Sequence, residues 1–71
     1  MAANVKTEVP GNVWQVCVVR GDRVEVGGVL FILEVMKTEV PHVAPIAGVV
    51  AAVKIAEGQS VDADVVAVVL E

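Results

Sequence analysis

The residues with the clearest chemical potential lie in the segment Leu33-Glu34-Val35-Met36-Lys37-Thr38-Glu39-Val40. Two strands with apolar patterning meet there, and the turn between them must fall near Met36-Lys37 although the segment contains no Gly, Pro or Asn. Turn positions usually carry small residues. A long cationic side chain at this tip therefore needs a reason beyond folding, and covalent attachment of a group to the Lys37 amine is such a reason.

The other reactive residues predict no second chemical centre. His42 has no Ser, Cys or Asp partner readable nearby and is interpreted as a surface or packing histidine. Cys17 is the only cysteine, which excludes an internal disulfide and a metal site built on paired cysteines. Lys6 and Lys54 are interpreted as solvated strand lysines. Without a nucleophile–base pair, a metal-ligand cluster or a phosphate loop, we expect no catalytic residue, no metal and no enzyme.

The composition points to the fold that must position the tip. The chain has 71 residues, 56% of them apolar, and we expect a single domain over residues 1–71 with one core. Twenty residues are Val, while Trp14 and Phe31 are the only aromatics. Because β-branched side chains are stiff and fit pleated sheets, this composition predicts an all-β fold.

The distribution of charge and apolar residues argues against nucleic acid and against a membrane as partners. The net charge is −4, and the five Lys and Arg residues are spread singly, so no basic patch exists to bind nucleic acid. The longest charge-free stretch, 40–53, contains Pro41, Pro45 and Gly48 and is too short to span a membrane as a helix. The first residues lack the basic and apolar segments of a secretion signal. We therefore expect a cytoplasmic protein. We also expect the chain to be monomeric when free.

An internal repeat organises the chain. A shift of 37 positions aligns residues 11–34 with residues 48–71 without a gap. The most informative matches are Gly11 with Gly48, Gly21 with Gly58, and the final Leu-Glu of each half. Gly21 and Gly58 stand where a hairpin turn needs a positive φ, which costs Gly little energy.

The repeat predicts the same strand order in both halves, and neither half can bury its apolar face alone. We predict a flattened β-barrel or sandwich of two four-stranded antiparallel sheets with a pseudo-two-fold internal repeat, and with both chain ends opposite the tip. Alternation predicts that Trp14, Val16 and Val18 face the core. The predicted strands are 13–19, 23–26, 29–35, 49–55, a short strand centred on Val61, and 65–70.

With these residues in view, the chain resembles the biotin/lipoyl attachment domains, and most closely the stand-alone biotin carboxyl carrier-like proteins. Glu34-Val35-Met36-Lys37 is similar to the biotinylation motif of this family, usually Ala-Met-Lys-Met. The sequence departs from that motif at Val35 and Thr38, where the family commonly has Ala and Met. The further landmarks that match are Pro10-Gly11, Gly21-Asp22, Ala44-Pro45 with Gly48, and Glu57-Gly58.

The resemblance implies a biotin carboxyl carrier with biotin attached covalently to Lys37. It also implies that Glu34, Val35, Met36 and Thr38 flank the lysine for recognition by a biotin protein ligase. The ligase activates biotin as its adenylate, and a biotin carboxylase and a carboxyltransferase are the further partners. Two alternatives stay open, a lipoyl carrier and an unmodified lipoyl-like interaction module. Lipoyl domains usually have Asp before the lysine, so Met36 favours biotin.

Overall fold

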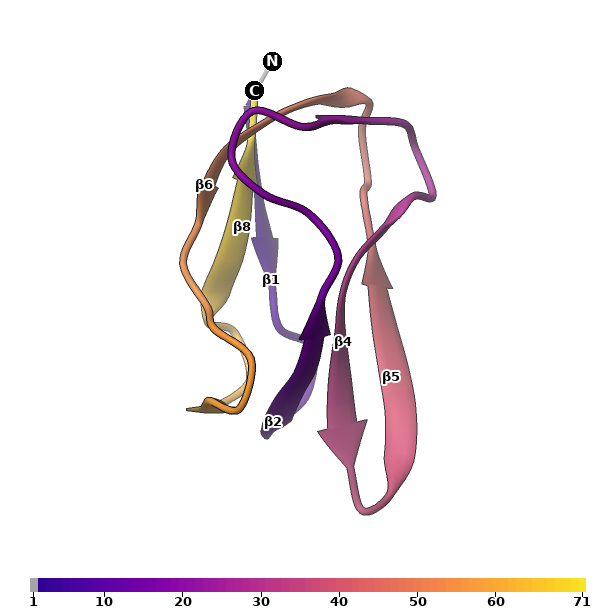
Figure 1. The fold of residues 1–71 in the computed structure, drawn as a ribbon, viewed down its shortest axis with the longest axis vertical. Coiled ribbons are helices and arrows are strands. Elements are labelled where there is room, and N and C mark those ends of the chain that lie inside the picture. The colour runs from indigo at the N-terminus through magenta and orange to yellow at the C-terminus, as the bar shows by residue number, and fades with distance from the viewer. Residues whose placement is uncertain (1) are drawn as a thin grey trace.

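The computed structural model describes residues 2–71, which form two facing four-stranded antiparallel sheets (Figure 1). The predicted all-β fold is confirmed. No helix in residues 2–71 has the length and apolar character needed to cross a membrane. The strands are β1 (Ala3–Lys6), β2 (Gly11–Val16), β3 (Arg23–Val24), β4 (Val29–Val35), β5 (Thr38–Val43), β6 (Gly48–Val53), β7 (Ser60–Val61) and β8 (Val66–Leu70).

The topology confirms the pseudo-two-fold repeat. The strand orders are β1-β8-β6-β3 and β5-β4-β2-β7. The 37-residue shift places β1 on β5, β8 on β4, β6 on β2 and β3 on β7, so it converts one sheet order into the other. The repeat therefore extends beyond 11–34 and 48–71 to include β1 and β5.

The two halves exchange their short strands, which corrects the prediction that Gly21 and Gly58 form hairpin turns. β3 pairs with β6, and β7 pairs with β2. The Gly21 and Gly58 turns have φ of 95° and 88°, as predicted, but they carry the chain across the sandwich. Gly21 N–H donates to the Val50 carbonyl at 2.8 Å, and the repeat-related Gly58 N–H donates to Val13 at 2.8 Å. For this reason β2 ends at Val16, earlier than the predicted Val19.

The prediction that Trp14 faces the core is wrong, and a β-bulge is the reason. Val13 pairs with Leu33 but Gln15 pairs with Ile32, so Trp14 is an extra residue in β2. The bulge reverses the alternation, which buries Val13 and leaves Trp14 49% exposed. Val18 is buried as predicted, and Val16 is partly buried against the core. The repeat-related bulge lies between Val50 and Ala52.

The hydrophobic core lies between the sheets and is aliphatic except for Phe31. Strands β4 and β8, which both lie in the interior of their sheets, supply most of its fully buried side chains. Removing these side chains from water is the main stabilising term of the fold. The largest are Phe31, Leu30 and Leu33 on β4, and Leu70 and Val68 on β8.

The start of β1 and the end of β8 lie at one end of the long axis, and the β4–β5 hairpin turn lies at the other (Figure 1). Ala3 and Leu70 are direct partners in the β1–β8 ladder, so the first and last strands meet side by side. The predicted separation of the chain ends from the tip is confirmed.

Candidate functional site

The candidate site is the turn between β4 and β5. Val35 and Thr38 are the last ladder pair, so Met36 and Lys37 alone make the loop. Their φ angles are 49° and 66°. A two-residue loop with positive φ at both positions is a type I′ turn, which matches the right-handed twist of the flanking strands. The predicted location of the turn is confirmed.

This turn is strained for the residues that occupy it. Positive φ costs a non-Gly residue about 1 kcal/mol, and type I′ turns prefer Asn-Gly for that reason. Neither Met36 nor Lys37 is an asparagine or a glycine, so neither residue type lowers this cost. Strained residues of this kind concentrate at functional sites, where the surrounding structure holds them in place. Here the long β4–β5 ladder holds them.

The tip projects both side chains into solvent. Met36 is 94% exposed, which is exceptional for an apolar residue, and Lys37 is exposed as well. Within residues 2–71 the Lys37 amine has no hydrogen bond and no carboxylate within 4.0 Å. Within these residues the amine is therefore unpaired and accessible to solvent.

The hairpin brings all five predicted site residues together. Glu34 and Glu39 are ladder partners, and both carboxylates are exposed. Thr38 is exposed, while Val35 is half-buried at the base of the tip. Glu34, Val35, Met36 and Thr38 thus lie next to Lys37 at one end of the hairpin, with Glu34 and Val35 on opposite faces of β4.

Gly11 supports the tip, and the sequence reasoning did not give it this role. A Cβ on Gly11 would lie 2.8 Å from the Glu34 carbonyl oxygen and 2.9 Å from Cγ2 of Val35. Only glycine allows β2 to approach the base of the hairpin this closely. The match of Gly11 with Gly48 in the repeat was the sequence feature that could have indicated this role. A Cβ on Gly48 would likewise lie 2.5 Å from a carbonyl oxygen, that of Glu71.

His42 also supports the hairpin. The side chain is 4% exposed, so the interpretation as a packing histidine is confirmed. Its Nε2 accepts a hydrogen bond from the Glu8 backbone N–H at 3.0 Å, which requires an unprotonated Nε2. The proton of the neutral ring is then on Nδ1, which lies 3.2 Å from the Val40 carbonyl and donates to it. His42 therefore fixes β5 to the segment that follows β1.

The site holds no features of a metal centre or an enclosed pocket. Within residues 2–71 no group of three or more His, Cys, Asp or Glu side chains is placed to hold a metal ion. The tip itself is convex, and Lys37 and its neighbours do not line the cavity found elsewhere in the molecule. The exposed amine suits a group held by a covalent bond to Lys37.

Comparison with known proteins gives consistent matches. The family described as biotin-requiring enzyme matches residues 1–70. The "biotinylated protein TB7.3 homolog" of Mycobacterium leprae is 40% identical over 70 residues, covering 97% of this chain and 99% of that protein. The "biotin/lipoyl attachment protein" of Bacillus subtilis is 45% identical over 58 residues, covering 82% of this chain and 80% of that protein.

Two solved structures share the fold over nearly the whole chain. The urea carboxylase of Kluyveromyces lactis matches with a TM-score of 0.93 and 31% identity, covering 100% of this chain. A single-chain, multi-domain long-chain acyl-CoA carboxylase matches with a TM-score of 0.90 and 26% identity over 96% of this chain. This chain spans only 6% and 7% of those two proteins.

Proposed function

Since the chain belongs to the biotin/lipoyl attachment family, we propose that it is a biotin carboxyl carrier modified on Lys37. The observation that carries the proposal is the free, exposed amine of Lys37 at a strained two-residue turn. The biotinylated Mycobacterium leprae relative and the two carboxylase structures support biotin as the attached group.

The residues at the tip fit this cofactor. An amide bond to Lys37 needs an accessible amine, and no side chain of residues 2–71 pairs with it or covers it. When attached, biotin supplies a ureido ring that carries a carboxyl group between two enzyme sites. The flexible four-carbon stem of the lysine provides reach, and the rigid β4–β5 hairpin presents the stem at a fixed place.

The chain does not activate its own lysine. Formation of an amide requires the lysine nitrogen to lose a proton to a base. Lys37 has no hydrogen-bonded base among residues 2–71. A biotin protein ligase must therefore take the proton while the amine displaces the adenylate from the biotin carboxyl carbon. Glu34, Val35, Met36 and Thr38 are the surface by which the ligase recognises the tip.

The chain itself is a carrier, and the chemistry belongs to its partners. A biotin carboxylase loads the carboxyl group and a carboxyltransferase unloads it. The convex tip suits this role because a protruding hairpin can enter two different active sites in turn. Restricting the group to the tip also raises its concentration near each enzyme when the proteins are bound.

Lipoyl attachment is the second candidate, since the name of the Bacillus subtilis relative covers both groups. The test is co-expression with a biotin protein ligase and excess biotin, read out by intact mass. Gain of a single biotinyl group supports the proposal when Lys37→Arg removes it and Lys54→Arg, a change at another exposed lysine, retains it. No gain with a ligase that modifies a known acceptor refutes it. The same assay with a lipoate ligase then decides between a lipoyl carrier and an unmodified module.

A further inference from the structure

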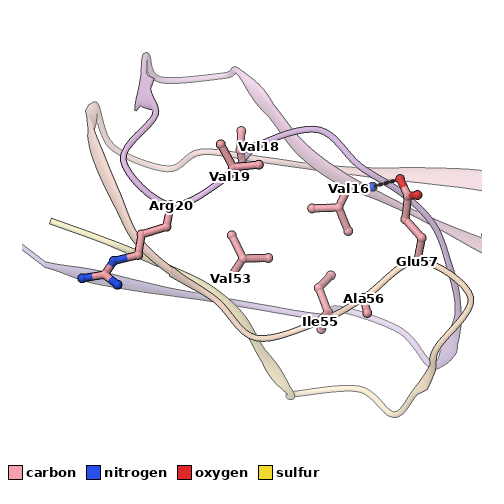
Figure 2. A pocket seen from close by; sticks show the side chains of 8 residues that line it. All are labelled: Val16, Val18, Val19, Arg20, Val53, Ile55, Ala56 and Glu57. Atoms are coloured by element: carbon pink, nitrogen blue, oxygen red, sulfur yellow. Dashed lines mark hydrogen bonds between the residues drawn. The ribbon is translucent and has the colours of Figure 1, made fainter.

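A cavity of about 430 Å³ lies between the segment 16–20 and the segment 53–57, and no residue of the tip lines it (Figure 2). Its floor and walls are aliphatic, and its two ends carry one charged residue each. Pockets of this size that are apolar with a few polar groups are typical binding sites. We call it the slot, and its lining residues are Val16, Val18, Val19, Arg20, Val53, Ile55, Ala56 and Glu57.

The slot lies on the pseudo-two-fold axis of the fold, because the repeat maps its lining onto itself. At each wall position, an aliphatic side chain in one half of the repeat corresponds to an aliphatic side chain in the other half. At the two ends, by contrast, the repeat replaces a cation with an anion. The shape is therefore symmetric, whereas the charge is not. The 37-residue shift pairs Val16 with Val53, Val18 with Ile55, Val19 with Ala56, and Arg20 with Glu57.

Both end charges are available to a ligand. Oε2 of Glu57 accepts a hydrogen bond from the Val16 backbone N–H at 3.0 Å, which fixes the carboxylate at one end (Figure 2). Its second oxygen has no hydrogen bond within residues 2–71. Arg20 lies at the other end and forms no ion pair within 4.0 Å in the described part of the chain. Val19, on the wall beside Arg20, is 66% exposed.

We propose that the slot binds an extended segment of a partner protein that presents an aliphatic side chain between a carboxylate and a cation. The aliphatic side chain fills the space between the valines, where its burial drives binding. The carboxylate pairs with Arg20, which offers a bidentate set of donors. The cation pairs with the free oxygen of Glu57. The opposite end charges fix which way the segment lies.

Other occupants fit less well. A fatty acid would satisfy Arg20 but would leave its apolar tail against the Glu57 carboxylate. A second copy of the chain offers Met36 as its most exposed apolar side chain, at 94%. A contact between Met36 of one copy and the slot of the next joins different surfaces, so it does not close into a two-fold dimer.

The test uses short blocked peptides and the full chain labelled with ¹⁵N. In an extended strand alternate side chains share a face, so the first probe is acetyl-Asp-Thr-Leu-Thr-Lys-amide. The second probe, acetyl-Lys-Thr-Leu-Thr-Lys-amide, replaces the acid. We expect the first probe to bind with a Kd on the order of 1 mM, and to shift the amide signals of Val18, Val53 and Ile55. The second probe should bind roughly tenfold more weakly.

Reversing the charge at position 20 tests whether Arg20 selects the carboxylate of the peptide. In Arg20→Glu the preference between the two peptides should reverse, because the new carboxylate repels the acid and attracts the lysine. Arg23→Glu makes the same change in net charge outside the slot, at a side chain that is 73% exposed, and should keep the preference of the parent. Equal behaviour of the two variants overturns the proposal, since net charge alone would then explain it.

Three further results would also overturn the proposal. One is no binding of the first peptide at millimolar concentration. Another is a set of shifted signals that centres on the tip. The third is self-association of the free chain through the slot, seen as concentration-dependent shifts at Val18 and Ile55 that Met36→Ala abolishes. The peptide assay runs on chain with unmodified Lys37, so its result is independent of the proposed carrier function.

Discussion

The imidazole of His42 stacks on the ring of Phe31, with the ring centroids 4.5 Å apart and the planes 19° apart. Phe31 is fully buried in β4 and His42 lies beside it in β5. The stack therefore joins the two strands of the hairpin whose far end carries Lys37. Because His42 also accepts from Glu8 N–H, one side chain links the hairpin to the segment that follows β1 of the opposite sheet.

His42→Ala should lower the free energy of unfolding by about 2 kcal/mol, because it opens a cavity against Phe31 and removes the acceptor for Glu8 N–H. Urea unfolding followed by Trp14 fluorescence measures the change. Val43→Ala removes carbon from a neighbouring residue that is 47% exposed, and should cost less than about 1 kcal/mol. If the two variants lose equal stability, the stack does not support the hairpin.

Met36→Asn should stabilise the protein by about 0.5 kcal/mol, because Asn accepts a positive φ more readily than Met does. The same change should slow modification of Lys37, since it removes part of the surface offered to the ligase. Thermal unfolding and the rate of mass gain measure the two effects. Thr38→Asn, at a strand residue without positive φ, is the control and should not stabilise. A parallel loss of stability in both variants would show that the turn stores no strain.

Gly11→Ala and Gly48→Ala form a matched pair, since the repeat relates the two positions. Each added methyl group meets a backbone carbonyl oxygen at less than 3.0 Å, and should cost about 2 kcal/mol. Only Gly11 lies against Glu34 and Val35, so only Gly11→Ala should also slow modification of Lys37. Denaturant unfolding and a ligase time course at a temperature where both variants are folded test this. Equal rates in the two variants would contradict a role for Gly11 in placing the tip.

Thr7→Val should destabilise the fold by about 2 kcal/mol, because it leaves two backbone groups without partners. The Thr7 hydroxyl donates to the Asp62 carbonyl at 2.6 Å and accepts from Val65 N–H at 3.0 Å. The side chain is 1% exposed, so water cannot replace it. Thr38→Val makes the same chemical change at an exposed position and should alter stability by less than about 0.5 kcal/mol. Calorimetric unfolding of both variants gives the comparison.

Local sequence signals predicted the turns and the tip well. Gly21 and Gly58 adopt positive φ as their residue type suggests, and β4 runs over Val29–Val35, as predicted. The position of Met36-Lys37 followed from two apolar strands meeting without a conventional turn. These features depend on residues close together in the chain, which is the information that a single sequence carries most directly.

Three features that depend on distant pairing were not predicted. The bulge at Trp14 is a choice of register between β2 and β4, and no property of the local sequence marks it. The exchange of β3 and β7 between the two sheets was not predicted. A glycine with positive φ is compatible both with a hairpin turn and with a crossing to the other sheet. The buried contacts of His42 join residues 34 positions apart in the chain, so they become visible only in the folded structure.

The pairing of Ala3 with Leu70 has a mechanical consequence. These residues face each other in adjacent strands, so their Cα atoms lie about 5 Å apart. A larger protein that binds the domain at Ala3 and Leu70 therefore holds it at a single point. The domain is 33 Å long, with the Lys37 turn at the far end. If the domain rotates about that point, Lys37 moves along an arc whose radius is close to the full length of the domain.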